Sequence, residues 1–367
     1  MKNLRNNKRY SLFLLLLALV IVGCNSGKQS KEASTADFID VSSPLPKVFF
    51  KKFQGTLSTG QIITLYITRN TNSNDGDTLF HYVIESGYEE VPESGITNLK
   101  PDSSFAINIY GYQHDSTYSI LSGHFLSGAI IKANFFVQKL KSNDSIQLLE
   151  VKSPIEVFPI NYYNSKTEIA DSANRGGMCD TFESTISLDI LTFKSKDRAV
   201  DKLNRLLDFY LQFDKHLKEK YIPESGQEWA STSIIYFEDR IITVEVSQGG
   251  YQCGAAHGMY GYCYCNYDLE KGDTISLTDI IPASSFNKLE AICEQKYKKE
   301  NADWLNGDIW HFYLTRNYAL LRKGLLFRYQ PYEIGPYSAG AIEVFVPYSE
   351  IYGLMNSNSE VVKRIFR

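Results

Sequence analysis

The residues whose types could support chemistry are concentrated in one stretch, residues 247–266, which reads SQGGYQCGAAHGMYGYCYCN. Its five glycines allow positive φ angles and a close approach of the backbone to a partner. His257 lies among them and is a candidate general base. Three cysteines in the same stretch add metal binding or disulfide formation as further possibilities.

A row of tyrosines follows this glycine-rich turn. In a strand over residues 260–269, Tyr260, Tyr262 and Tyr264 would lie on one face, with a glycine and two cysteines on the other. Tyrosine hydroxyls left free on a strand face make a good contact surface. The row would equally suit packing against a helix, and the alternation alone leaves both interpretations open.

A second candidate surface lies further along the chain, where Tyr332, Glu333 and Tyr337 fall between Pro331 and Gly340. Tyrosines and a carboxylate on a loop stiffened by proline suit recognition of a protein or a sugar. The alternative is a loop that packs back on its own domain. The predicted binding residues are therefore Tyr251, His257, Gly258, Tyr260, Tyr262, Tyr332, Glu333 and Tyr337.

The sequence lacks the common catalytic signatures. It contains no Gly-x-Ser-x-Gly elbow, no His-Glu-x-x-His pair and no Walker loop. A single histidine in a tight turn more often bonds backbone than performs chemistry, so we expect a binding protein and not an enzyme. The alternative is an enzyme that acts on peptidoglycan or another glycan, with His257 as its base.

Five cysteines follow Cys24, namely Cys179, Cys253, Cys263, Cys265 and Cys293. Zinc sites usually place two to four residues between paired cysteines, whereas one residue separates Cys263 from Cys265. We therefore expect no metal and no cofactor, although a thiolate site that includes His257 is an alternative. Because residues two apart on a strand rarely bridge each other, a disulfide from Cys253 to Cys263 or to Cys265 is favoured over one between Cys263 and Cys265, and free thiols are the alternative.

Alternating apolar and polar residues, typical of strands, and apolar residues at three- and four-residue spacing, typical of helices, together indicate an α+β protein with two domains. Residues 47–152 alternate apolar and polar positions in short runs, which predicts an all-β meander or partial barrel. We place a domain boundary in residues 151–178, which are rich in proline, glycine and polar residues.

Residues 175–360 are predicted to form a β-rich domain with two packed helices. Apolar residues at three- and four-residue spacing indicate one helix over residues 196–221 and another through residues 286–297. Alternating patterns predict strands over residues 182–190, 233–237, 241–247, 260–269, 325–329 and 342–346.

The first 24 residues have the pattern of an export signal, with a basic start, an apolar run over residues 12–22 and Gly23 before Cys24. The run is shorter than the about 20 residues of a membrane-spanning helix. Its end, Ile-Val-Gly-Cys, resembles the lipobox of bacterial lipoproteins, in which the cysteine is lipidated. We therefore predict a signal peptide over residues 1–23 and a lipidated Cys24 that begins a flexible tether, residues 24–46.

Charge and tether sequence limit the partners and the location. Cleavage before Cys24 would reduce the basic residues from 38 to 34 against 42 acidic ones, so the net charge would change from −4 to −8. An acidic surface is unsuited to nucleic acid and to anionic lipid, so the lipid on Cys24 would provide the membrane contact. A tether that begins Asn25-Ser26 and has no acidic run favours the outer membrane and its periplasmic face.

Short motifs follow one another in order through the second domain: Gly-Ala-Ala-His-Gly at 254–258, Asn-Tyr-Asp-Leu at 266–269, Gly-Asp-Thr-Ile-Ser-Leu at 272–277, Phe-Arg-Tyr-Gln-Pro-Tyr-Glu-Ile at 327–334, Pro-Tyr at 336–337, Gly-Ala-Ile at 340–342 and Val-Pro-Tyr at 346–348. Together they resemble the RsiV-like extracellular domain, a domain of unknown function named after an anti-sigma-V factor whose outer domain binds lysozyme. The resemblance covers roughly residues 175–355. Residues 180–225 are similar to the domain that precedes it in that family, also seen beside a polysaccharide deacetylase. The family usually has glycine in place of Ala255.

The resemblance implies binding of a lysozyme-like protein or of another envelope ligand such as peptidoglycan. Control of a sigma factor needs a cytoplasmic segment and a membrane-spanning helix, and the expected cleaved signal provides neither, so we do not expect that role. The prediction is a non-catalytic lipoprotein of the cell envelope with an RsiV-like binding domain.

Overall fold

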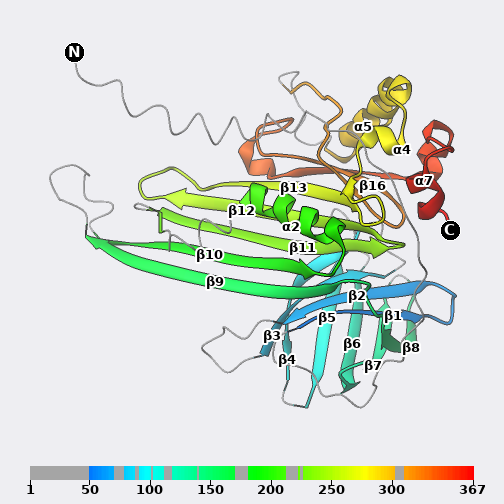
Figure 1. Ribbon diagram of the computed structural model, residues 1–367, viewed down its shortest axis with the longest axis horizontal. Coiled ribbons are helices and arrows are strands. Elements are labelled where there is room, and N and C mark those ends of the chain that lie inside the picture. The colour runs from blue at the N-terminus through cyan, green and yellow to red at the C-terminus, as the bar shows by residue number, and fades with distance from the viewer. Residues whose placement is uncertain are drawn as a thin grey trace. The chain divides into compact units, whose positions relative to one another are not determined.

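The chain folds mainly into β-sheets, as the computed structural model in Figure 1 shows. The structure describes residues 49–69, 78–86, 91–100, 102–110, 118–138, 140–169, 181–211, 222–223, 226–301 and 310–367. The predicted signal peptide, Cys24 and the tether therefore lie outside the described residues. Among those that are described, no helix combines the length and the apolar character that crossing a membrane requires.

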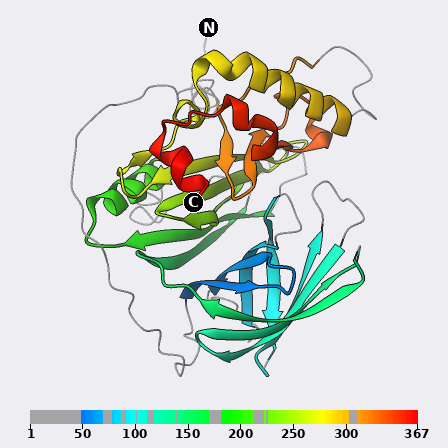
Figure 2. The ribbon, with the colours of Figure 1, turned by 90° about the vertical axis from the view of Figure 1, so that its right-hand side faces the viewer.

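The first sheet is an antiparallel near-barrel of eight strands: β1 Phe49–Thr56, β2 Ile62–Arg69, β3 Thr78–Glu85, β4 Glu93–Leu99, β5 Ser104–Tyr110, β6 Tyr118–Ser127, β7 Ile130–Val137 and β8 Ser142–Glu150. Because β1 pairs with both β2 and β8, the meander curls round and leaves β4 and β5 as its two ends (Figure 2). The Thr97 hydroxyl on β4 donates a hydrogen bond to the Ala106 carbonyl on β5 at 2.7 Å. The predicted partial barrel is confirmed, with β4 and β8 as unexpected strands.

The second sheet has six strands: β9 Glu156–Ile169, β10 Thr181–Lys194, β11 Gly226–Glu238, β12 Ile241–Gln252, β13 Met259–Asp268 and β14 Asp273–Thr274. Helix α2, Arg198–Leu211, lies across one face of it (Figure 1) and buries Val200, Leu203 and Leu207. The predicted helix over residues 196–221 is confirmed as far as Leu211, and the remainder lies outside the described residues. Strand β9 occupies part of the region, residues 151–178, in which a domain boundary was predicted.

The third sheet is small, with β15 Tyr318–Leu320, β16 Gly324–Tyr329 and β17 Ile342–Pro347. The predicted second helix is α5, Phe286–Glu300, which buries Leu289, Cys293 and Tyr297. Short helical segments complete this part: α4 Leu277–Ile280, η2 Ala283–Ser285, η3 Tyr337–Ala339, α6 Tyr348–Ile351, η4 Tyr352–Leu354 and α7 Glu360–Ile365. Strands predominate and the helices lie in the C-terminal part, so the α+β prediction is confirmed.

A group of buried charges joins the near-barrel to the C-terminal sheets, all within one compact unit, Ile39–Arg367. Lys52 of β1 donates to the Phe237 carbonyl and to Glu238 on β11, both at 2.7 Å. Arg322 donates to the same Glu238 at 2.7 Å and to Glu85 on β3 at 3.0 Å. Burial lowers the pKa of Lys52 and raises the pKa of Glu85 because it disfavours the charged forms. Two cations thus balance two carboxylates at this junction.

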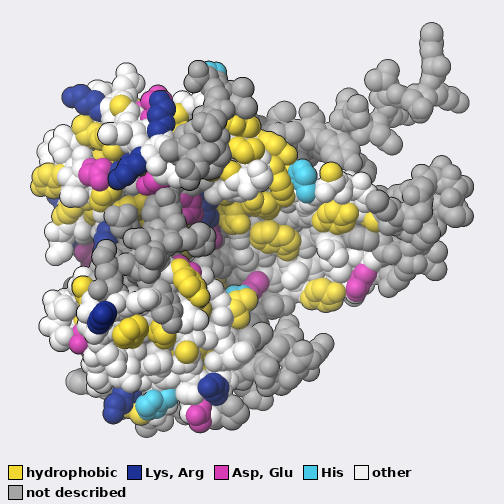
Figure 3. All heavy atoms as spheres, turned by 180° about the vertical axis from the view of Figure 1, so that it is seen from behind, with side chains coloured by type: hydrophobic (Ala, Val, Ile, Leu, Met, Phe, Trp, Pro, Cys, Tyr) yellow, Lys and Arg dark blue, Asp and Glu magenta, His cyan; other side chains and the backbone are white. Residues whose placement is uncertain are grey.

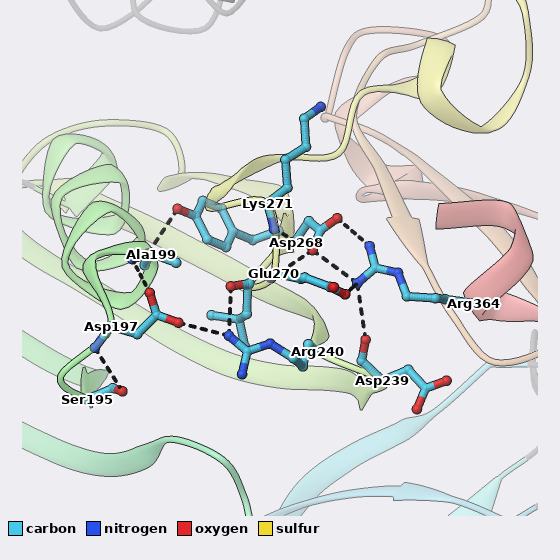
Figure 4. A network of polar contacts seen from close by, with 11 residues as sticks. Ser195, Asp197, Ala199, Asp239, Arg240, Asp268, Glu270, Lys271 and Arg364 are labelled. Carbon is cyan, nitrogen blue, oxygen red and sulfur yellow. Dashed lines mark hydrogen bonds and ion pairs between the residues drawn. The ribbon is translucent and has the colours of Figure 1, made fainter. Parts of the chain in front are cut away.

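Arg364 fixes the last helix, α7, to the second sheet and lies in the polar network of Figure 4. Its guanidinium pairs with both carboxylate oxygens of Asp268 at the end of β13 and donates to the Asp239 carbonyl at 3.3 Å. Asp268 also accepts hydrogen bonds from the amides of Glu270 and Lys271, at 2.9 and 3.1 Å. Arg364 and Asp268 are both buried and have lost most of their contact with water. Each charge is therefore stabilised mainly by the other.

Substitution of Arg364 by Met should lower the free energy of unfolding by about 3–5 kcal/mol, because it leaves the carboxylate of Asp268 buried without its cation. Its neighbour Lys363 forms an exposed ion pair with Glu360, and Lys363→Met provides a matched control that should change stability little. Urea denaturation followed by circular dichroism measures both variants. Equal stability of the two would contradict a structural role for the buried pair.

Candidate functional site

Two segments far apart in the sequence meet at the end of the second sheet and form an aromatic cluster of His257, Tyr260, Tyr262, Tyr332 and Tyr337. The His257 ring stacks on the Tyr337 ring with 3.9 Å between centroids. Tyr332 lies beside both rings, 6.5 Å from His257 and 5.6 Å from Tyr337 between centroids. The structure therefore brings five of the predicted binding residues into one group.

Hydrogen bonds hold the histidine in one orientation. Its Nδ1 donates to the Gly258 carbonyl at 2.8 Å, so in the neutral ring Nε2 is free to accept from the Tyr332 hydroxyl at 3.3 Å. The Tyr337 hydroxyl donates to the same Gly258 carbonyl at 2.6 Å. Among the described residues, the recorded partners of His257 are thus a carbonyl and a tyrosine, whereas an activated general base is usually oriented by a carboxylate.

The tyrosine row of β13 lies on the face of the sheet opposite α2. Tyr260, at the end of the row near the turn, makes edge contacts with Tyr262 and Tyr337, both with 5.8 Å between centroids. The Arg328 guanidinium covers Tyr262 and Tyr264, at 4.5 and 4.9 Å from the ring centroids. The row therefore becomes more deeply packed along the strand from the turn towards Tyr264, and α2 lies on the other face of the sheet.

Side-chain amides hold the third sheet against β13. Strand β13 pairs with β12 along its length, but with β14 only through its last two residues. On this otherwise free edge, Gln330 accepts from the Tyr262 amide at 2.9 Å and Asn317 accepts from the Tyr264 amide at 3.0 Å. Buried Asn266 bonds the backbone of β15. No local pattern in the sequence indicates a role for these three amides, because none shows which strand edge they reach.

The three other predicted residues adjoin the cluster in different ways. A Cβ added to Gly258 would stand 2.9 Å from the Gly250 carbonyl and 3.7 Å from the Tyr251 Cβ, so Tyr251 lies beside the turn and Gly258 is required by the close approach. Glu333, in contrast, directs its carboxylate into its own loop. It accepts from the Gln330 amide at 2.7 Å, and burial raises the pKa of its carboxyl group.

The predicted disulfide is wrong. Cys253 is disulfide-bonded, but Cys263, Cys265 and Cys293 are free, so the partner of Cys253 lies outside the described residues. Cys263 and Cys265 lie opposite Val246 and Val244, several residues along β12 from the turn that carries Cys253, which explains why no bridge joins them. The described residues hold no group of three or more His, Cys, Asp or Glu placed to share a metal ion.

Comparison with known proteins identifies a domain of unknown function at the C-terminus. Residues 278–349, which include the loop of Tyr332 and Tyr337, match the family model described as a protein of unknown function, DUF3298. A solved DUF3298 family protein from Bacteroides fragilis NCTC 9343 has 17% sequence identity and a TM-score of 0.45, over 57% of this chain and 97% of that one. Another, from Pseudomonas aeruginosa PAO1, has 20% identity and a TM-score of 0.43, over 56% and 96%. No curated protein matches the chain.

The three free thiols should be inert in the folded protein. Burial raises the pKa of Cys263 and of Cys293 to about 12 and also raises that of Cys265, so thiolate is scarce near neutral pH. Iodoacetamide at about pH 8 should therefore modify them only after denaturation, and Cys253 only after reduction as well. Mass spectrometry of the labelled peptides measures this. Rapid native labelling of Cys263 would show that it is accessible as a thiolate.

Proposed function

We propose that this protein is a non-catalytic binding protein of the cell envelope and that the aromatic cluster is its contact surface. The observation that carries the proposal is the stack of His257 on Tyr337, whose segments lie about 80 residues apart and are joined by the bond from Tyr337 to Gly258. Exposed rings held in fixed positions lose little conformational entropy on binding.

The chemistry of the cluster favours recognition over catalysis. Tyrosines offer both an apolar face and a hydroxyl, which is why they are common at the centres of interfaces. Tyr332 is 50% exposed at the edge of the cluster. His257 is oriented by a carbonyl and a tyrosine, an arrangement that fixes a ring without activating it as a base.

The ligand belongs to the envelope, in this proposal a lysozyme-like protein or a component of the cell wall. The motif series between residues 254 and 348 resembles the RsiV-like extracellular domain, and the loop with Tyr332 and Tyr337 belongs to the DUF3298 domain. The amides of Gln330 and Asn317 hold that domain's edge against β13 and so keep both halves of the cluster together.

The anchor is proposed to be the lipid on Cys24, after removal of residues 1–23. The near-barrel, residues 47–152, would then stand between the tether, residues 24–46, and the binding domain, residues 175–360. The supporting observations are the basic start, the apolar run and the Ile-Val-Gly-Cys sequence. The periplasmic face of the outer membrane is the proposed location.

Loss of a cluster ring should weaken binding. Tyr332→Ala and Tyr337→Ala should each reduce affinity for a lysozyme or for isolated peptidoglycan about tenfold or more, as is typical of central aromatic contacts. Tyr352, exposed at another place in the C-terminal part, supplies the control variant Tyr352→Ala. Biolayer interferometry and co-sedimentation measure the affinities, with circular dichroism to verify folding. Equal affinities of all three variants and the wild type would refute the assigned surface.

Replacement of Cys24 by Ala should abolish metabolic labelling with palmitate and release the protein from the membrane fraction, because the thiol that accepts the lipid is removed. Cys293→Ala is the matched control, since this buried cysteine belongs to the core. Membrane retention of an unlabelled Cys24→Ala protein would show that something other than lipid anchors it.

A further inference from the structure

A row of side chains crosses the second sheet at one level. The strand registers pair Tyr163 of β9 with Ser187, Ser187 with Trp229 of β11, Trp229 with Gly249, and Gly249 with Tyr260 of β13. Directly paired residues of neighbouring strands point to the same face. Across five strands the row therefore alternates between an aromatic and a small residue. We name its three aromatic residues the aromatic ladder.

The ladder lies on the face of the sheet opposite α2 and is open to solvent. Tyr163 is 59% exposed and Trp229 is 39% exposed. A Cβ added to Gly249 would stand 2.8 Å from two atoms of the Trp229 indole, so the absence of a side chain there gives the ring its room. From behind, Figure 3 shows separate hydrophobic side chains among polar ones over this face.

The spacing of the ladder positions is comparable to the repeat of a sugar chain. Neighbouring strands lie about 4.8 Å apart, so the backbone positions of the ladder residues, on every second strand, stand about 10 Å apart. In an extended β-linked glycan, every second sugar presents the same face at a comparable interval, and its C–H groups can stack on an aromatic ring. We propose that the aromatic ladder binds an extended neutral glycan, with alternate sugars stacked on Tyr163, Trp229 and Tyr260.

Hydroxyl groups lie next to the ladder. In the adjacent row, Ser231 and Ser247 are neighbours on β11 and β12, with 2.7 Å between their oxygens. Beyond them is a pocket of about 230 Å³ between the sheet and the near-barrel, lined also by Thr68, Ser94 and Phe50. Sites for drug-sized ligands measure about 300–1,000 Å³. This pocket is smaller than that range, and its size suits a single sugar ring or a substituent of the glycan.

The charges in the rows beside the ladder are paired. Asp189 lies 3.1 Å from His81 Nε2, and Glu245 lies 2.6 Å from Arg328, which pairs also with Glu343. In the second group one arginine faces two carboxylates, so a ligand on this face meets aromatic rings, hydroxyls and an excess of negative charge. Such a surface suits a neutral, hydroxyl-rich ligand better than an anion.

The ladder runs into the aromatic cluster. Tyr260 belongs to both, since it is the last ring of the ladder and contacts Tyr337 with 5.8 Å between centroids. A chain bound along the ladder would extend towards His257 and Tyr332. The inference rests on the proposed binding function and names its ligand class.

Calorimetric titration of the full exported chain with chitohexaose, a neutral β-linked oligosaccharide, tests the ladder, with cellohexaose as a second probe. Trp229→Ala and Tyr163→Ala should each weaken binding about tenfold or more, because each removes a ring from contact with the ligand. Phe209→Ala is the control, since Phe209 is 62% exposed on α2, which covers the opposite face. Chitobiose, too short to reach two rings, should bind far more weakly than chitohexaose.

Two outcomes would overturn the glycan assignment: neither oligosaccharide binds, or Trp229→Ala and Tyr163→Ala both bind like the wild type. If Tyr332→Ala still weakens binding of a lysozyme or of peptidoglycan, the proposed function stands and only the ladder fails. If Tyr332→Ala and Tyr337→Ala keep wild-type affinity for every ligand while Trp229→Ala loses chitohexaose, the ladder stands and the cluster is not the contact surface.

Discussion

Alternation along β10, β11, β12 and β13 decides which side chains lie under α2 and which remain on the other face of the second sheet. The positions under the helix are apolar and buried, among them Ile186, Leu188, Val244 and Val246. The opposite positions on the same strands include serines, a glycine and separate aromatic residues, together with Asp189 and Glu245. One face therefore holds the core together, and the other is chemically suited to contact a ligand. Both the aromatic ladder and the tyrosine row of β13 follow from this division.

The near-barrel covers part of that second face and supplies hydrogen-bond and ion-pair partners for polar groups of the sheet. Tyr66 on β2 is fully buried, and its hydroxyl accepts a hydrogen bond from the Phe237 amide at 3.0 Å. Lys52, Arg322, Glu85 and Glu238 lie beside it in a balanced group. Because desolvation offsets much of the attraction in a buried ion pair, this group contributes more to a defined geometry than to stability. Tyr66 also lines the pocket beside Ser231.

Elements with strong periodicity could be predicted from the sequence, and those without it could not. Strand β13 and helix α5 have clear apolar spacing and were expected almost as they are. Strands β4, β8 and β9 carry polar residues on exposed faces, and β9 also contains Pro159, so their patterns resembled loops. The meeting of His257 with Tyr337 agrees with both being predicted contact residues, but the ladder depends on strand register across β9 to β13, which no local pattern contains. The disulfide prediction failed for a related reason, since it required knowing how far along the strands each cysteine lies from the turn.

The most direct measurement is the indole N–H resonance of Trp229 during a titration of the full chain with chitohexaose, assigned by comparison with Trp229→Phe. A ligand stacked on the ladder should shift this resonance progressively and to saturation. The indole N–H resonance of Trp310, which follows α5 in the C-terminal part, should not shift during the same titration. An unchanged Trp229 resonance at saturating oligosaccharide would contradict the assignment of this sheet face as the ligand-binding surface.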